Sequence, residues 1–314
     1  MTTAEVNVSR FRAWVMAARP QTLPAAVAPV LVGTGLALHE HVFDARAALV
    51  AMAGAALIQI GTNFANDYYD ARRGADTDER EGFTRVTQAG LIPARRVKFA
   101  MLTTFALAIL TGTYLVYVGG LPVVVIGLAS VFAGWAYTGG PYPLGYHGLG
   151  EVFVFVFFGL VAVAGTFYVQ AAATLAGPLP TTIPNGTITA ESLVAGLPVA
   201  CLSSAILVVN NLRDIETDAA AGKRTLAVRL GERKTEYEYV LLIAAAYAVP
   251  FWFWQFSTAF SAWVLAPLVT IPHAALLARY VREMDGVDLN WALERTGLLT
   301  ALYAVTFAGG MIFA

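Results

Sequence analysis

Long stretches without a single Asp, Glu, Lys or Arg constrain the fold of this chain more than any other feature of its sequence. Of the 314 residues, 58% are hydrophobic and 13% are charged, whereas soluble domains are about 45–50% apolar and about 25% charged. A transmembrane helix needs about 20 consecutive, mainly apolar residues, so these stretches predict an integral membrane protein. The stretches are Thr22–His39, Ala47–Asn66, Phe99–Gly150, Val152–Ala190, Ser192–Leu212, Tyr239–Ala278 and Thr296–Ala314.

The lengths of these stretches predict nine transmembrane helices. Phe99–Gly150 is long enough for two helices that break around Gly119-Gly120-Leu121-Pro122, and Tyr239–Ala278 is also long enough for two. Val152–Ala190 holds one helix and then a loop over Gly177–Thr189, which is rich in Pro, Gly and Thr. Strands of a membrane β-barrel would alternate in hydropathy, whereas these stretches are continuously apolar. We therefore expect an all-α, polytopic membrane protein with one domain over residues 1–314.

The positive charges predict the orientation of the chain. With a cytoplasmic N-terminus and nine alternating helices, 19 of the 20 Lys and Arg residues fall on the cytoplasmic side, and only Arg46 falls outside. A bias of this strength predicts a cytoplasmic N-terminus in a cell (inner) membrane, with a polar cap that faces the cytoplasm. The net charge of −1 provides no field that attracts nucleic acid. A single cysteine, Cys201, excludes an intrachain disulfide.

Two acidic clusters lie at helix ends on the predicted cytoplasmic side. Asn63, Asp67 and Asp70 are spaced i, i+4, i+7, which puts them on one helix face. Asn66 directly precedes Asp67 in the same segment. The second cluster repeats the spacing Asn-x-x-x-Asp of the first. Its members are Asn210, Asp214 and Asp218, at i, i+4 and i+8. Acidic residues next to membrane spans are costly, so they indicate a functional site.

Carboxylates that face each other repel unless a cation lies between them. Mg²⁺ prefers oxygen ligands and often binds carboxylates together with phosphate oxygens, so the two clusters can clamp a diphosphate through Mg²⁺. Neutralising its charge makes the diphosphate a better leaving group, and aromatic side chains would stabilise the resulting allylic cation. Basic candidates for the diphosphate are Arg72, Arg73, Arg85, Arg213, Lys223 and Arg224, and aromatic candidates are Tyr137, Tyr142, Tyr146, Phe153, Phe155, Phe157 and Phe158.

Other interpretations of these residues stay open from the sequence. One Asp-rich helix end alone is commonly a solvated cap, although two on the same side favour a site. The phenylalanines between Phe153 and Phe158 also fit lipid-facing or core positions. Glu151, at a predicted helix start, either orients a substrate or complements the helix dipole. A secondary transporter with polar residues near the bilayer midplane is a remote alternative.

Several segments are similar to one known family. They include Arg19-Pro-Gln-Thr-Leu-Pro24, Asn66-Asp-Tyr-Tyr-Asp70 with Gly74-Ala-Asp76, Thr84-Arg85 through Gly90, Tyr137-Thr-Gly-Gly-Pro141 through Gly145, and Asn210 through Gly231. The chain resembles the UbiA superfamily of intramembrane aromatic prenyltransferases, and within it the 1,4-dihydroxy-2-naphthoate prenyltransferases of the menaquinone pathway. Many members have an acidic residue where Gly74 stands here, which leaves the role of Asp76 open. Many members also have a basic residue where Gln21 stands, so Gln21 is assigned no role.

The resemblance implies a reaction and a set of site residues. It implies Mg²⁺-dependent transfer of a polyprenyl chain from an allylic diphosphate to 1,4-dihydroxy-2-naphthoate with loss of CO₂. A phytyl donor, or homogentisate or 4-hydroxybenzoate as acceptor, would use the same diphosphate site, and the chain length of the donor is open. The implied catalytic and metal-binding residues are Asp67, Asp70, Asp214 and Asp218. The resemblance also implies Asn63 or Asn66 beside these carboxylates and Arg85, Lys223 and Arg224 as contacts of the diphosphate. The residue patterns described above add further candidates for substrate binding, namely both asparagines together with Asn210, Tyr137, Tyr142 and Glu151.

Overall fold

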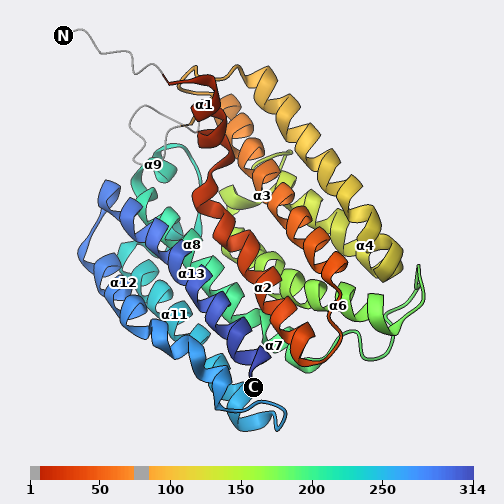
Figure 1. The fold of residues 1–314 in the computed structure, drawn as a ribbon. Helices are drawn as coiled ribbons and strands as arrows, with labels where there is room; N and C mark the ends of the chain where they lie inside the picture. Colours follow the sequence, from red (N-terminus) through yellow and green to blue (C-terminus); the bar gives the residue numbers. More distant parts are fainter. Residues whose placement is uncertain (1–7, 74–84) are drawn as a thin grey trace, which may run out of the picture.

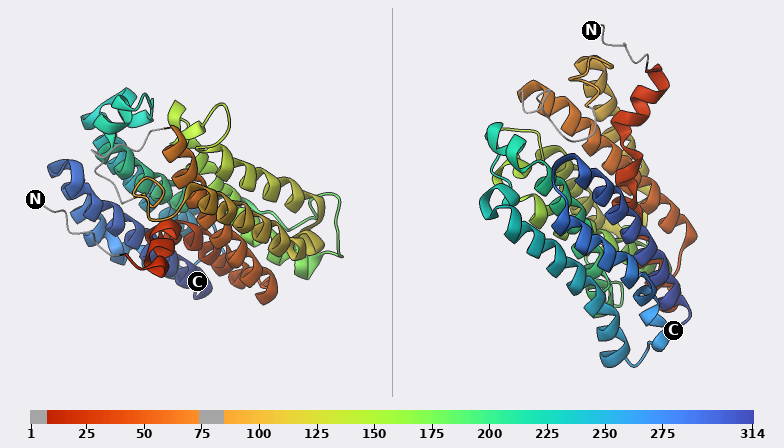
Figure 2. Two further views of the ribbon diagram at one scale, coloured as in Figure 1. Left: turned by 90° about the horizontal axis from the view of Figure 1, so that it is seen from above. Right: turned by 90° about the vertical axis from the view of Figure 1, so that its left-hand side faces the viewer.

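The computed structural model describes residues 8–73 and 85–314, and every regular element in these ranges is a helix. The prediction of an all-α fold is confirmed. The long helices lie side by side in an elongated bundle, with α1 toward one end and the C-terminal end of α13 toward the other (Figures 1 and 2). The α-helices are α1 (Arg10–Ala18), α2 (Leu23–His39), α3 (Ala45–Arg73), α4 (Ala94–Ala136), α5 (Gly150–Val154), α6 (Ala162–Leu175), α7 (Ala190–Val194), α8 (Gly196–Arg213), α9 (Ile215–Ala220), α10 (Leu226–Leu230), α11 (Glu232–Phe256), α12 (Ile271–Glu283) and α13 (Leu289–Ile312). Shorter 3-10 or π segments are η1 (Pro20–Thr22), η2 (Leu144–His147), η3 (Phe155–Val161), η4 (Ala262–Thr270) and η5 (Gly286–Asp288).

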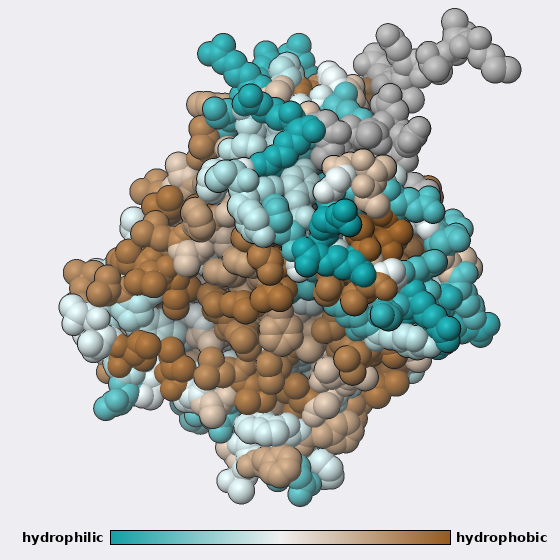
Figure 3. Space-filling model, turned by 180° about the vertical axis from the view of Figure 1, so that it is seen from behind, coloured by the Kyte–Doolittle hydropathy of each residue, from teal (hydrophilic) through white to brown (hydrophobic). Residues whose placement is uncertain are grey.

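The predicted apolar stretches coincide with the long helices. Within the described ranges, seven helical segments are long and apolar enough to cross a membrane. Brown, hydrophobic residues cover the middle of one face of the molecule, and hydrophilic residues gather toward one end and one side of it (Figure 3). These features support an integral membrane protein. The seven segments are Arg10–His39, Ala45–Arg73, Ala94–Ala136, Gly150–Leu175, Ala190–Arg213, Glu232–Phe256 and Ala262–Glu283.

The longest helix, α4, is broken where the sequence predicts a break. Gly120 has φ 62° and ψ −149°, a backbone conformation that is essentially restricted to glycine. Two hydrogen bonds hold the broken end: Leu121 N donates to Pro180 O at 2.9 Å, and the Tyr168 hydroxyl donates to Gly119 O at 2.6 Å. The two arms of α4 can therefore run back alongside each other, and both contribute to the cavity described below.

Two groups of helices surround the two larger of three apolar cores. The largest core contains residues of α2, α6, α8, α11, α12 and α13, and the second contains residues of α1, α3 and α4. A small third core joins α3, α4 and α6. Close packing within each group joins α2 to α13, α8 to α11, and α3 to α4. The candidate site lies where the two groups meet.

Candidate active site

A cavity of about 610 Å³ extends between the two groups of helices. At one end it is lined by charged residues of both acidic clusters, Asp70, Asp214 and Asp218, together with Arg85 and Lys223. The rest of its wall is mainly Ala, Gly, Val, Leu, Ile and Phe from α2, α3, α4, η3 and α6. The cavity therefore offers a polar end for a charged group and an apolar space for a hydrocarbon chain.

One face of α3 carries the first acidic cluster into this cavity. Gln59, Asn63, Asn66 and Asp70 all line it, and their spacing of four, three and four residues keeps them on one helix face. Asp70 is only 2% exposed. Its carboxylate accepts hydrogen bonds from Arg85 Nη2 at 2.9 Å and from the Tyr146 hydroxyl at 2.7 Å. The buried negative charge of Asp70 is thus paired with a buried guanidinium.

Asp67 lies at the edge of this face, and its carboxylate points elsewhere. It accepts hydrogen bonds from Val86 N and Thr87 N, both at 3.0 Å, and from the Thr87 hydroxyl. Asp67 is 1% exposed and does not line the cavity. Its carboxylate therefore holds the segment that carries Arg85 and does not face the cavity in this arrangement. Asp76 and Gly74 lie outside the described residues.

The second acidic cluster begins at the end of α8 and continues into α9. The Arg213 guanidinium donates from Nε and Nη2 to the two carboxylate oxygens of Asp214, at 2.8 and 2.7 Å. The same side chain donates to Asn210 Oδ1 at 2.9 Å and to Asn290 Oδ1, on α13, at 2.8 Å. These hydrogen bonds of Arg213 fix the orientation of the Asp214 carboxylate and tie it to α13.

Asp218 is paired with the basic loop that follows it. Lys223 Nζ lies 3.0 Å from Asp218 Oδ1, and Lys223 N donates to Asp218 O at 2.9 Å. The backbone N of Arg224 donates to Tyr146 O at 2.8 Å, but the Arg224 side chain is exposed and does not line the cavity. Lys223 thus lines the cavity, whereas the Arg224 side chain lies away from it.

The segment between α4 and α5 closes the polar end of the cavity. Arg73 donates to the carbonyl oxygens of Thr138 and Gly140, and the Thr138 hydroxyl donates to Asn66 Oδ1 at 2.9 Å. The Tyr146 ring lies beneath two cations, with Arg73 Cζ at 5.3 Å and Lys223 Nζ at 5.1 Å from its centroid. Tyr146 thereby connects the two acidic clusters, a link that spacing along the chain does not reveal.

The phenols of Tyr137 and Tyr146 remain protonated hydrogen-bond donors. Burial, followed by the negative charges of Glu151, Asp218 and Asp70, raises the pKa of Tyr137 well above its ordinary value. Burial and the adjacent Asp70 carboxylate raise the pKa of Tyr146 in the same direction. Tyr137 lines the cavity as predicted. Tyr142 does not: it is 56% exposed, and its ring stacks on His147 with centroids 3.6 Å apart.

Glu151 reaches the site through a neighbour. Its side chain is buried and does not line the cavity, but its Oε1 accepts a hydrogen bond from Asn211 Nδ2 at 2.7 Å. One hydrogen of the Asn211 amide is donated to Glu151, so the second N–H and the Oδ1 acceptor can serve the cavity that Asn211 lines. Sequence reasoning assigned no role to Asn211.

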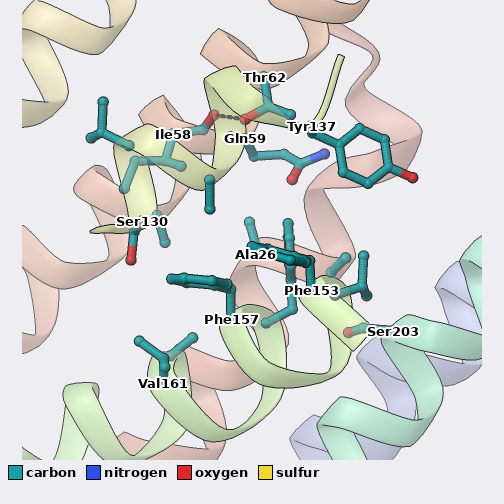
Figure 4. Close-up of a pocket in the computed structure, with 18 of the residues that line it drawn as sticks. Ala26, Ile58, Gln59, Thr62, Ser130, Tyr137, Phe153, Phe157, Val161 and Ser203 are labelled. Carbon is teal, nitrogen blue, oxygen red and sulfur yellow. Dashed lines mark hydrogen bonds between the residues drawn. The ribbon is translucent and has the colours of Figure 1, made fainter. Parts of the chain in front are cut away.

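A π-helical segment shapes the aromatic wall. The η3 turn follows α5, and π-helical turns frequently occur at functional sites. Phe153 and Phe157 stack with ring centroids 5.8 Å apart, and Figure 4 shows both rings in the cavity below Tyr137 and Gln59. Phe158 also lines the cavity, whereas Phe155 packs against the largest core.

Four further polar residues at the cavity escaped sequence reasoning. The Thr22 hydroxyl accepts hydrogen bonds from Gln59 Nε2 and Asn63 Nδ2, both at 2.9 Å. Ser203, from α8, and Arg19 also line the cavity. Gln59 precedes Asn63 by four residues and Ser203 precedes Asn210 by seven, so helical periodicity extended into the apolar stretches would have found both.

The donor set fits Mg²⁺ once a phosphate ligand is included. In residues 8–73 and 85–314, no three carboxylate, imidazole or thiol groups converge into a ready-made metal centre. Mg²⁺ commonly uses one or two carboxylates and takes its other ligands from phosphates and water. Asp70, Asp214 and Asp218 supply such oxygens from two sides of one cavity.

Comparison with known proteins identifies the family. The model of the UbiA prenyltransferase family matches residues 26–309. The chain belongs to the UbiA prenyltransferase family. This UbiA family member is therefore a prenyltransferase and an integral membrane protein, and the transporter alternative is not supported.

Individual relatives cover nearly the whole of this UbiA family member. It is 39% identical over 307 residues to the 1,4-dihydroxy-2-naphthoate octaprenyltransferase of Mycobacterium tuberculosis. This alignment covers 98% of this chain and 99% of the relative. The Escherichia coli protein of the same name is 40% identical, with 96% of each chain covered. A UbiA homologue from Archaeoglobus fulgidus, solved with GPP and Mg²⁺, shares the fold with a TM-score of 0.66 at 16% identity, over 96% of this chain and 100% of that one.

Proposed function

We propose that this chain transfers a polyprenyl group from an allylic diphosphate to 1,4-dihydroxy-2-naphthoate in a Mg²⁺-dependent reaction that releases CO₂. The product would be a demethylmenaquinol. One observation carries the proposal: charged residues of both acidic clusters meet at the polar end of a cavity whose remaining wall is apolar. The names of full-length relatives at 39% and 40% identity support the choice of acceptor.

The ion pairs of the site suggest how a magnesium diphosphate binds. Asp70 is paired with Arg85, and Asp218 with Lys223. A diphosphate would attract Arg85 and Lys223, while Asp70, Asp214 and Asp218 would hold Mg²⁺. The metal would supply neutralisation of the charge on the leaving diphosphate. Asn63, Asn66 and Asn210 would support these contacts through their polar side chains, and Asp67 would fix the Arg85 segment.

The allylic cation that forms in the chemical step needs an environment that excludes water and is rich in π-electrons. The carbon–oxygen bond of the donor breaks, and the diphosphate leaves with the electron pair. The rings of Tyr137, Phe153 and Phe157 would stabilise the allylic cation, and the apolar wall would exclude water from it. A carbon of the naphthoate ring forms the new bond, and departure of the carboxylate as CO₂ returns electrons to the ring in place of proton loss.

Asn211 and Glu151 are proposed to orient the acceptor. The Asn211 amide is fixed by its hydrogen bond to Glu151, so its Oδ1 can accept a hydrogen bond from an acceptor hydroxyl. This bond would direct the ring and raise its electron density. Tyr142 and the Arg224 side chain have no role in this proposal because both are exposed away from the cavity.

The membrane arrangement completes the proposal. Counting the two arms of α4 as separate spans and adding α13 to the other candidate spans gives nine. We infer one intramembrane domain over residues 1–314, with the N-terminus and the polar end of the cavity facing the cytoplasm of the cell (inner) membrane, because the basic residues concentrate on that side.

An acceptor comparison tests the proposed reaction. Purified protein in detergent receives farnesyl diphosphate, Mg²⁺ and one acceptor at a time: 1,4-dihydroxy-2-naphthoate, homogentisate or 4-hydroxybenzoate. We expect a prenylated, decarboxylated product by mass with the naphthoate. Product with another acceptor and none with the naphthoate would refute the acceptor assignment while retaining prenyl transfer.

A further inference from the structure

Two buried polar side chains of the cavity wall each have an atom without a hydrogen-bond partner in the part of the chain that the structure describes. These atoms are Gln59 Oε1, on α3, and Ser203 Oγ, on α8. Gln59 is 7% exposed and Ser203 is 2% exposed. A polar atom that is removed from water costs free energy unless another partner replaces the water. Both atoms therefore indicate a ligand that brings polar groups into this part of the cavity.

The hydrogen bonds of Thr22 fix the orientation of the Gln59 amide. The Thr22 hydroxyl donates to Arg19 O at 2.9 Å, so it can only accept a hydrogen bond from Gln59. Gln59 Nε2 is accordingly the donor in this contact, at 2.9 Å, and Asn63 Nδ2 donates to the same hydroxyl. The free atom of the amide is therefore its oxygen, which accepts hydrogen bonds and donates none. A group that satisfies Gln59 Oε1 must carry an O–H or an N–H.

Gln59 and Ser203 lie at matching depths below the polar end of the cavity. Gln59 precedes Asp70 by 11 residues along α3, and Ser203 precedes Asp214, the residue that follows α8, by 11 residues. This separation is about 16 Å along each helix at 1.5 Å per residue. With covalent bonds of about 1.5 Å, a diphosphate and a bicyclic ring placed end to end span roughly 12 Å. The two polar atoms therefore lie at a depth that an aromatic acceptor can reach beside a donor whose diphosphate is bound at the acidic clusters.

Of the two substrates, only the acceptor can satisfy these atoms. The hydrocarbon part of the donor has no polar group, whereas 1,4-dihydroxy-2-naphthoate has one hydroxyl next to its carboxylate and a second hydroxyl on the opposite side of the same ring. Gln59 and Ser203 come from different helices, and in the view of Figure 4 the ring of Phe153 lies between them. Phe153 and its stacked neighbour Phe157 offer an aromatic surface to the naphthalene ring.

We propose that Gln59 and Ser203 form the part of the acceptor site that selects a dihydroxylated ring. Gln59 Oε1 accepts a hydrogen bond from the hydroxyl remote from the carboxylate. Ser203, on the same helix as Asn211, contacts the opposite edge of the ring, which bears the carboxylate and the other hydroxyl. A ring without the remote hydroxyl leaves Gln59 Oε1 unpaired, which weakens its binding. The inference rests on the proposed function, because it assumes a naphthoate acceptor.

Removal of the Gln59 amide tests this selection. Wild-type protein and Gln59→Met are assayed in detergent with farnesyl diphosphate and Mg²⁺. Two constants are compared: the KM for 1,4-dihydroxy-2-naphthoate and the inhibition constant of 1-hydroxy-2-naphthoate, which lacks the remote hydroxyl. In Gln59→Met we expect the KM for the acceptor to rise about tenfold. The inhibition constant should fall or stay within about twofold, because the analogue no longer leaves a buried oxygen unpaired. The KM for farnesyl diphosphate should stay unchanged.

Gln170, on α6, offers a matched control. It is fully buried, its Oε1 also lacks a partner within the described residues, and its Nε2 donates to the Thr34 hydroxyl at 3.2 Å, but it does not line the cavity. Gln170→Met should therefore leave the ratio of the two constants at its wild-type value. Ser203→Ala should weaken both aromatic ligands by a similar factor, because both carry the edge of the ring that Ser203 contacts.

The outcomes separate the selection from the proposed function. An unchanged ratio of the two constants in folded Gln59→Met overturns the role of Gln59, and Ser203→Ala without effect on either ligand overturns that of Ser203. If Gln59→Met does not fold, Gln59→Asn, whose shorter side chain withdraws the amide oxygen, replaces it with a smaller shift expected in the same direction. Wild-type protein that does not prenylate 1,4-dihydroxy-2-naphthoate would instead contradict the proposed function.

Discussion

At the scale of single residues, the site is a set of buried carboxylates that are each held by a cation. Asp70 pairs with Arg85, Asp214 with Arg213, and Asp218 with Lys223. Buried charges are tolerated only with such partners. The cations of these pairs differ in their surroundings. Arg213 is fixed by hydrogen bonds to Asn210 and Asn290, whereas Arg85 and Lys223 line the cavity.

Removing a charge from either acidic cluster should abolish turnover. Asp70→Asn and Asp214→Asn keep the size of the side chain but lose the charge that Mg²⁺ requires, so we expect kcat to fall by about two orders of magnitude or more. Melting in detergent should show that both variants remain folded. Cys201→Ala, buried on α8 and away from the cavity, is the control and should stay near wild-type activity. Near-normal turnover in either Asn variant would remove the proposed metal clamp.

Asp67 should respond differently from Asp70. Asp67→Ala removes the acceptor for Val86 N and Thr87 N, so we expect a lower melting temperature and a raised KM for the donor as the Arg85 segment loosens. Asp67→Asn retains one acceptor oxygen and should recover much of the activity. If Asp67→Asn is as inactive as Asp70→Asn, Asp67 is a ligand and the positioning role is wrong.

The sequence predicted the two clusters but not the direction of every side chain in them. Successive residues of a helix are separated by about 100°, so Asp67 and Asp70 differ by about 60° around the axis. That difference is enough for Asp70 to line the cavity while Asp67 contacts Val86 and Thr87. The sequence also did not predict that the side chains of Tyr142 and Arg224 lie away from the cavity, because loop residues have no periodicity that predicts which way they point.

At the scale of helices, the stretches without charged residues predicted where the long helices lie. The predicted break at Gly119–Pro122 is the break of α4, and the predicted loop over Gly177–Thr189 follows α6. Hydropathy could not predict the π-helical turn η3 or the contact of α13 with Arg213, because both depend on packing between distant segments. The pairing of Asp214 with Arg213 likewise required the fold.

The break in α4 should be intolerant of any side chain. In Gly120→Ala, the new Cβ would overlap the Pro180 backbone, and the positive φ of 62° would be strained. We expect destabilisation of about 2 kcal/mol or more, measured as an earlier unfolding midpoint in detergent. Gly309→Ala, in open space on α13, should be neutral or stabilising by up to about 1 kcal/mol. Equal midpoints for the two variants would mean that the break is not rigidly held.

At the scale of the whole molecule, one cavity has a charged end and an apolar remainder. In the proposed reaction, the charged end would bind the diphosphate of the donor and the apolar part would bind its hydrocarbon chain. A donor that partitions into the bilayer can keep its tail in lipid while its charged end reaches the cap. This arrangement requires that the cap face the compartment that contains Mg²⁺ and the water-soluble acceptor. The orientation of the chain is therefore part of the functional account.

Thiol labelling in intact cells tests that orientation. Cys201 is the only cysteine, so Cys201→Ala provides a background in which single cysteines can be placed. We expect a membrane-impermeant maleimide to label Arg46→Cys from outside, because Arg46 is exposed at the start of α3. Arg95→Cys, exposed at the start of α4, should be labelled only after the membrane is opened. The reverse pattern would invert the proposed topology.

The most direct test of the account is whether naphthoate prenylation depends on a divalent metal. Purified wild-type protein is incubated with 1,4-dihydroxy-2-naphthoate and geranylgeranyl diphosphate in three conditions: with Mg²⁺, with EDTA, and with EDTA followed by excess Mg²⁺. Products are identified by mass. The account predicts a prenylated, decarboxylated naphthoquinol in the first and third conditions and none in the second. Product formation that is unaffected by EDTA would contradict the magnesium diphosphate clamp.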